Sequence, residues 1–157
     1  MAVEIERKFL VKNNDFLKEV VESKKIIQAY ISKSSIANVR VRLINETGYI
    51  TIKGKSDEKC MSRFEWEHVI SKDEALTLIE FSKEHIVEKT RYIVPEKTGF
   101  VFEVDIFEKD NKGLIVAEIE LKTEDSYFVK PDWLGREVTT EKKYYNSKLS
   151  VNPYKLW

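Results

Sequence analysis

Charged residues recur at every second position in several stretches of this 157-residue sequence. The stretch AVEIERKFLV, at residues 2–11, places Glu4, Glu6 and Lys8 on one side of an extended chain. Arginines and lysines in such rows suit the oxygens of a polyphosphate, whereas carboxylates suit a hard divalent cation such as magnesium or manganese. Four later stretches carry same-sign pairs two residues apart: Arg40 and Arg42, Lys89 and Arg91, Glu103 and Asp105, Glu118 and Glu120.

The alternation of charged and apolar residues predicts that strands carry these groups. Turn signals at 45–48 and 109–113 favour hairpins and therefore antiparallel pairing. The strand pattern covers eight segments, at residues 2–11, 24–31, 38–44, 49–55, 63–70, 86–94, 100–107 and 114–121.

One helix is clearly marked between the strands. Ser71 and Glu74 form a capping-box pattern at the start of an apolar stripe, which predicts a helix over 71–81. Weaker helical patterns lie at 14–22 and within 141–151, and residues 123–139 are expected to be irregular or helical.

Two arrangements of the strands are compatible with this pattern. A half-exposed sheet with a wet polar face explains any single charged pair, since charge on a strand is usually solvated. The whole set favours a closed barrel, because same-sign neighbours repel unless a counter-charge lies between them. Eight strands can close around one small ligand. The predicted fold is a mainly β, α+β single domain over residues 1–157, an eight-stranded antiparallel tunnel with a charged interior and helices packed outside.

The apolar outside of such a barrel needs cover. The helices at 71–81 and 14–22 are expected to supply part of it, and Phe128, Trp133 and Trp157 are expected to pack the C-terminal segment against the barrel wall. An apolar patch left uncovered would suit a homodimer interface.

The composition excludes several classes of protein. Lysine plus arginine equals aspartate plus glutamate, 27 each, so a bulk nucleic-acid binder or membrane-surface binder is not expected. The single cysteine, Cys60, allows no intrachain disulfide, and no signal peptide or long apolar span is visible. A cytoplasmic protein is expected. Cys60 has no histidine nearby in sequence, and two isolated histidines, His68 and His85, do not make a zinc site.

At this point the sequence resembles the CYTH domain family, the triphosphate tunnel metalloenzymes. The family hallmark, Glu-x-Glu-x-Lys near the N-terminus, matches Glu4 to Lys8. The resemblance continues in order through the segments VRVRL, TIKG, SRFEWE, VEKTRY, FEVDIF, VAEIEL and GREVT. It implies a tunnel in which basic residues bind a triphosphate and acidic residues hold one or two divalent metal ions. Short chains like this one are similar mostly to inorganic triphosphatases.

Roles follow from charge and from this resemblance, because phosphoanhydride hydrolysis needs positioning and charge neutralisation. Lys8, Tyr30 and Glu65 are the expected catalytic residues. Glu65 and Glu103 also suit salt bridges to Arg63, and Tyr30 equally suits a phenol hydrogen-bonded in the wall. Near the C-terminus, Lys143 stands where the family often has arginine. The positive charge is kept, but a contact that depends on the guanidinium group of that arginine is not implied for Lys143. The expected substrate-binding residues are Lys8, Arg40, Arg42, Lys53, Arg63, Lys89, Arg91 and Lys143. The expected ligands of Mg²⁺ or Mn²⁺ are Glu4, Glu6, Glu103, Asp105, Glu118 and Glu120.

The leading interpretation is a metal-dependent enzyme that hydrolyses a small-molecule triphosphate, with inorganic triphosphate as the preferred substrate. A class IV-type adenylate cyclase or a thiamine or nucleoside triphosphatase is the enzymatic alternative, although the short chain offers no extra segment for a base pocket. A non-catalytic polyphosphate or nucleotide sensor is the alternative from another class. Binding of triphosphate without metal-dependent turnover would favour the sensor.

Overall fold

The computed structural model describes residues 3–157, which form nine strands and few helices. Eight strands fall where the charge alternation predicts them, and their ends differ from the predicted ends by a few residues. The strands are β1 (Val3–Val11), β2 (Glu22–Lys33), β3 (Ala37–Ile44), β4 (Thr47–Gly54), β5 (Ser62–Ile70), β6 (Ile86–Pro95), β7 (Val101–Phe107), β8 (Ile115–Glu120) and β9 (Leu134–Glu137).

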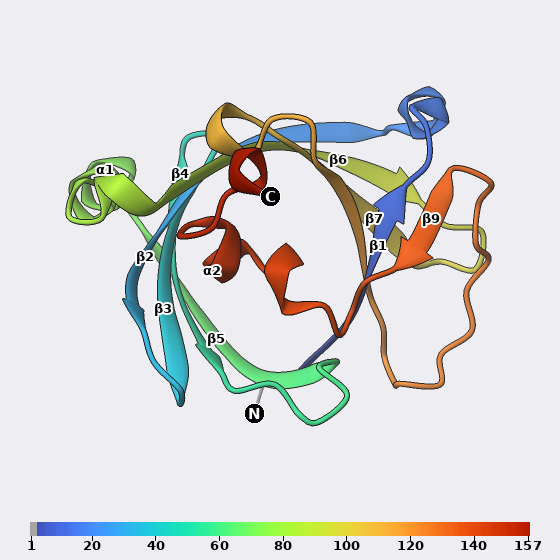
Figure 1. The fold of residues 1–157 in the computed structure, drawn as a ribbon, viewed down its shortest axis with the longest axis horizontal. Helices are drawn as coiled ribbons and strands as arrows, with labels where there is room; N and C mark the ends of the chain where they lie inside the picture. Colours follow the sequence, from blue (N-terminus) through green and yellow to red (C-terminus); the bar gives the residue numbers. More distant parts are fainter. Residues whose placement is uncertain (1–2) are drawn as a thin grey trace.

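The first eight strands close into an antiparallel barrel, which Figure 1 shows in a view along its axis. Their order around the barrel is β5-β4-β3-β2-β6-β7-β8-β1, and pairing of β1 with β5 closes the ring. The register sets Glu6 opposite Glu120 and Lys8 opposite Glu118 on β1 and β8. The closed-barrel prediction is therefore confirmed, and the closure brings charged faces from all eight strands to one interior.

The ninth strand, β9, lies within the region that the sequence predicts to be irregular or helical. It pairs with the end of β1, where Phe9 faces Glu137 and Val11 faces Leu134. The pairing continues past the strand, because the Val138 N–H donates to the Lys8 carbonyl at 2.8 Å. This short strand pairs with β1 outside the closed ring of eight strands. It leads the chain toward the end of the tunnel.

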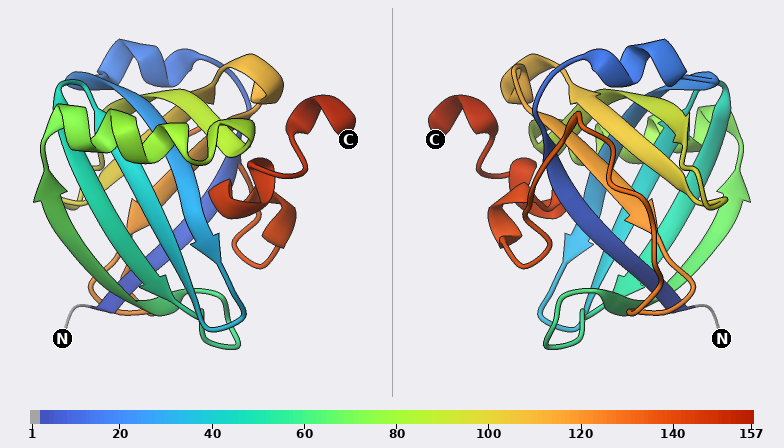
Figure 2. Two further views of the ribbon diagram at one scale, coloured as in Figure 1. Left: turned by 90° about the vertical axis from the view of Figure 1, so that its left-hand side faces the viewer. Right: turned by 90° about the vertical axis from the view of Figure 1, so that its right-hand side faces the viewer.

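Apolar side chains pack on the outside of the barrel. Phe9, Phe102, Phe128 and Trp133 belong to one buried cluster there, as predicted for Phe128 and Trp133. The prediction for Trp157 is wrong, because its ring packs on Tyr144 and Tyr154. Figures 1 and 2 show the reason, since the C-terminal segment lies across one end of the barrel instead of along its wall.

The helix α1 (Lys72–Glu80) covers the outer face of β2, β3 and β4. The predicted capping box is present, with the Ser71 hydroxyl accepting from the Glu74 N–H and the Glu74 carboxylate accepting from the Ser71 N–H. The predicted helix at 14–22 is a 3₁₀ turn at Asp15–Glu19. No helix within residues 3–157 combines the length and the apolar character needed to cross a membrane.

Gly48 sets how closely α1 approaches the barrel. A Cβ added there would lie 2.7 Å from the Ala75 Cβ and 2.7 Å from the Ser71 carbonyl oxygen. We expect Gly48→Ala to lower the free energy of unfolding by about 1–3 kcal/mol, since the helix must shift outward. Gly54→Ala is the matched control on the same strand, because its nearest contact would be 3.4 Å from the Phe64 Cβ. Urea unfolding of both variants checks this, and equal losses would contradict it.

Candidate active site

A cavity of about 300 Å³ lies inside the barrel and is lined by the inward-facing charged side chains. It brings together every predicted site residue except Asp105 and Lys143. The basic lining residues from the prediction are Lys8, Arg40, Arg42, Lys53, Arg63, Lys89 and Arg91. The acidic ones are Glu4, Glu6, Glu65, Glu103, Glu118 and Glu120, and Tyr30 lines the same cavity.

Arg40 and Arg42 form a cationic wall on β3. Arg42 donates to the Glu67 carboxylate at 3.0 Å, and Thr51 on β4 donates to the same carboxylate at 2.8 Å. Burial, then repulsion from Arg40 and Arg91, lowers the pKa of Arg42 to about 10. The Nε atoms of Arg40 and Arg42 are buried and have no hydrogen-bond partner within the described part of the chain. Buried donors are normally paired, so this wall suits an anionic ligand that supplies acceptors.

A second cationic group consists of Lys89 and Arg91 on β6, and both bind the carboxylate of Asp105 on β7. Lys89 Nζ lies 2.6 Å from one Asp105 oxygen, and Arg91 binds both oxygens at 2.7 and 2.8 Å. Arg91 also pairs with Glu103. Burial lowers the pKa of Lys89 to about 8, although Asp105 opposes the shift. Asp105 is fully buried beneath these two cations and does not line the cavity, so its position fits support of Lys89 and Arg91.

A third group joins β1, β4 and β5. Lys53 Nζ bonds both oxygens of Glu4 at 2.8 and 3.0 Å and lies 3.3 Å from Glu65. Arg63 Nε also reaches Glu4, at 3.3 Å. Burial raises the pKa of Glu4, but Lys53 and Arg63 outweigh it and bring the pKa to about 2. The ion pairs expected between Arg63 and Glu65 or Glu103 are not the ones found: Arg63 pairs with Glu4, whereas Glu65 pairs with Lys53 and Glu103 with Arg91.

Glu6 and Glu120 are the acidic residues that these ion pairs leave out. They face each other across β1 and β8, and neither makes an ion pair within residues 3–157. Burial, then Glu118 and Glu4, raises the pKa of Glu6 to about 8. Burial, then Glu4, Glu65 and Glu103, also raises the pKa of Glu120. Burial and neighbouring carboxylates disfavour the ionised forms of Glu6 and Glu120, and a divalent cation would offset this cost.

The donor set therefore fits a hard metal ion by its chemistry, since it contains carboxylate oxygens only. Glu118 adds a third oxygen donor between Glu6 and the cations, with one oxygen 3.6 Å from Lys8 Nζ. In residues 3–157, however, no three acidic, histidine or cysteine side chains already converge as a preformed metal cage. Glu4, Glu103 and Glu118 instead pair with neighbouring cations, so a metal would have to compete for these three carboxylates.

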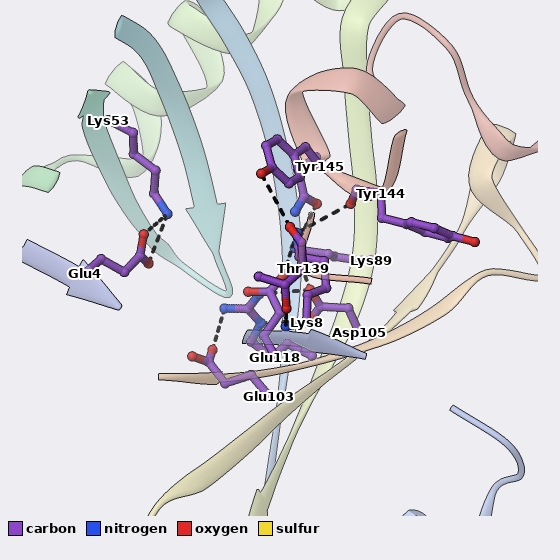
Figure 3. A network of polar contacts seen from close by, with 12 residues as sticks. Glu4, Lys8, Lys53, Lys89, Glu103, Asp105, Glu118, Thr139, Tyr144 and Tyr145 are labelled. Atoms are coloured by element: carbon purple, nitrogen blue, oxygen red, sulfur yellow. Dashed lines mark hydrogen bonds and ion pairs between the residues drawn. The ribbon is translucent and has the colours of Figure 1, made fainter. Parts of the chain in front are cut away.

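The C-terminal segment lies across one end of the barrel, as Figure 2 shows. Tyr145, Asn146 and Ser147 line the cavity from the start of the short helix α2 (Asn146–Leu149). Lys89 Nζ donates to Asn146 Oδ1 at 3.0 Å, and Lys8 Nζ lies 3.5 Å from the Tyr144 carbonyl, as seen in Figure 3. Burial raises the pKa of Tyr145.

Sequence reasoning missed these three lining residues. The segment has neither the charge alternation of the strands nor a long apolar stripe, so no local signal indicated a position at the tunnel. Lys143 does not line the cavity, and its Nζ lies 4.6 Å from the Trp157 ring centroid. The expected contact of Lys143 with substrate is therefore not supported by its position, because the aromatic cluster holds it outside.

The fold and the cavity define a class of protein: a closed, antiparallel tunnel whose interior carries separate anion-binding and cation-binding groups. Comparison with known proteins gives the same class. The chain matches the CYTH domain over residues 2–152, and it belongs to the CYTH family.

Individual relatives extend this comparison. An inorganic triphosphatase of Acetivibrio thermocellus is 44% identical over 156 residues, covering 99% of this chain and 97% of the relative. An inorganic triphosphatase of Nitrosomonas europaea is 32% identical over 152 residues, covering 95% and 97%. A crystal structure of an inorganic triphosphatase superposes with a TM-score of 0.70 at 31% identity and covers 96% of each chain.

Proposed function

We propose that this chain is an inorganic triphosphatase, which hydrolyses tripolyphosphate to pyrophosphate and phosphate inside the tunnel. The observation that carries the proposal is the pairing of two complementary walls in one cavity. Within residues 3–157, Arg40 and Arg42 present buried donors without partners, and Glu6 and Glu120 present carboxyl groups with raised pKa values and no ion pair. The relatives named inorganic triphosphatase support the same function.

In this proposal the basic residues bind the phosphoryl oxygens and stabilise the negative charge that develops on the leaving pyrophosphate. Arg40, Arg42 and Arg91 offer fork-shaped donors, and Lys8 and Lys53 offer point charges. Arg63 and Lys89 complete the cationic lining.

The acidic residues serve the metal in this proposal. Glu4, Glu6, Glu118 and Glu120 would hold one or two Mg²⁺ or Mn²⁺ ions, with Glu103 beside them. A bound ion neutralises phosphoryl oxygens and increases the acidity of a bound water. Asp105 keeps Lys89 and Arg91 in place through its ion pairs with them. Glu65 orients Lys53, to which it lies at 3.3 Å.

A substrate panel tests the proposal. Tripolyphosphate, ATP, thiamine triphosphate and long-chain polyphosphate are each supplied with magnesium and with manganese, and released phosphate, pyrophosphate and cyclic AMP are measured. Fast metal-dependent hydrolysis of tripolyphosphate is expected. Cyclic AMP from ATP would instead indicate a cyclase, and triphosphate binding without turnover would indicate a sensor.

The pKa of Lys89 gives a pH dependence for anion binding. Because burial places this pKa at about 8, Lys89 is charged below that pH and neutral above it in the folded protein. We expect the affinity for tripolyphosphate, measured by calorimetry in EDTA, to weaken as the pH rises through about 8. Lys89→Arg keeps its charge across this range and is expected to make the decline shallower, and the remaining decline comes from ionisation of Glu6, whose pKa is also about 8. Identical pH profiles for the two proteins would contradict the assignment.

A further inference from the structure

Gln28 is a buried polar residue on the inward side of β2 that the proposed function leaves without a role. It is 0% exposed, and its backbone lies between Arg42 on β3 and Val87 on β6. The Nε2 atom donates to the hydroxyl oxygen of Tyr30 at 3.5 Å. The Oε1 atom is buried and has no hydrogen-bond partner in residues 3–157.

This arrangement is unfavourable for folding. A buried carbonyl oxygen without a partner keeps its full desolvation cost, and the one hydrogen bond of the amide is long. An apolar side chain of similar size would avoid that cost, as do the neighbouring inward residue Ile26 and the outward residue Ala29. The amide at this position is therefore better explained by what it does to Tyr30 than by the stability of the wall.

The amide fixes how Tyr30 uses its hydroxyl group. Tyr30 is 7% exposed and lines the cavity. Gln28 Nε2 donates to the hydroxyl oxygen and so holds the phenol oxygen in place, and the phenol proton is not used in this contact because an amide nitrogen does not accept. No other hydrogen bond of the Tyr30 hydroxyl occurs among the described residues, so its O–H group is left to donate toward the cavity.

We infer that Gln28 is a positioning residue for the tunnel chemistry, which makes Tyr30 a hydrogen-bond donor to a phosphoryl oxygen of the bound substrate. The inference rests on the proposed triphosphatase function. Tyr30 stands opposite Arg40 across β2 and β3 and both line the cavity, so a phosphoryl group bound by Arg40 would lie on the same side of the wall as the Tyr30 side chain. The donor strengthens binding of charge that grows in the transition state.

The test replaces Gln28 by methionine, which has a similar length and no polar amide. We expect Gln28→Met to lower kcat on tripolyphosphate by about tenfold to a hundredfold while KM changes much less. Its melting temperature is expected to equal or exceed that of the unaltered protein, because the unpaired carbonyl is gone. Ser32→Ala, exposed on the same strand, is the control and is expected to change neither quantity.

A double-mutant cycle tests the route through Tyr30. Tyr30→Phe is expected to lower kcat by a similar factor, and Gln28→Met is expected to add almost nothing in that background. Additive losses would overturn the inference, as would a lower melting temperature of Gln28→Met or an unchanged kcat. If the unaltered protein hydrolyses no tripolyphosphate, the proposed function itself fails, which separates the two results.

Discussion

Replacing Glu120 by glutamine is expected to abolish metal-dependent hydrolysis of tripolyphosphate, with a loss of roughly a hundredfold or more in kcat. Glu120 faces Glu6 across β1 and β8, and an amide in its place keeps the shape but removes the charge that would hold a cation. Burial and three neighbouring carboxylates raise the pKa of Glu120. Removing its charge therefore relieves repulsion, and the melting temperature is expected to stay the same or rise.

The measurement is phosphate release at increasing magnesium and manganese concentrations. Glu46→Gln is the matched control, because Glu46 pairs with Lys72 on the surface at 2.6 Å, outside the tunnel. Activity of Glu120→Gln close to that of the unaltered protein would show that the metal assignment for this residue is wrong. If a high metal concentration restores the activity of Glu120→Gln, the substitution acts by lowering the affinity for the metal.

The second large effect is expected for Arg42→Ala. Arg42 carries a buried Nε without a partner in residues 3–157, and repulsion from Arg40 and Arg91 contributes to its lowered pKa. A triphosphate would relieve both conditions at once. We expect the affinity for tripolyphosphate and kcat/KM to fall roughly a hundredfold or more, since a buried charge-assisted contact is lost.

Calorimetric titration and initial rates measure this loss. Arg136→Ala is the control, because Arg136 pairs with Glu141 on the surface, away from the cavity. If Arg42→Ala binds and turns over tripolyphosphate as well as the control does, Arg42 does not contact the substrate. A lowered melting temperature alone would not produce a selective loss of affinity in a protein that remains folded at the assay temperature.

The barrel could be predicted from the sequence because the pattern that indicates it lies within each single strand and recurs from strand to strand. Each strand alternates apolar and charged residues, so the segment at Arg40 and Arg42 predicts one inward face and one outward face without reference to other strands. The same-sign pairs then favour closure, since only a partner wall of opposite sign relieves their repulsion. The structure has this arrangement, with Arg91 facing Asp105 across β6 and β7.

The detailed pairing inside the tunnel could not be predicted. Lys53 reaches Glu4, 49 residues away, because the register at the closure of β1 and β5 decides which side chains lie at the same level. The alternation of apolar and charged residues within a strand does not determine the register between two strands. The sequence therefore indicated which residues share the interior but not which carboxylate each cation would bind.

The C-terminal part escaped prediction for a different physical reason. β9 is only four residues long, too short to display an alternating pattern. Asn146 reaches the tunnel because Lys89 binds its side chain and His85 contacts the Ser150 carbonyl at 3.2 Å. Such contacts join residues that are distant in sequence, and no local pattern encodes them.

The internal ion pairs have a consequence for how ligands bind. Lys53 with Glu4, and Arg91 with Asp105 and Glu103, neutralise part of the interior charge before any ligand arrives. A triphosphate alone would take cations from the carboxylates and leave negative charge stranded, and a metal alone would strand positive charge. Each ligand is therefore expected to increase the affinity for the other by the same factor, so that substrate and metal bind most favourably together.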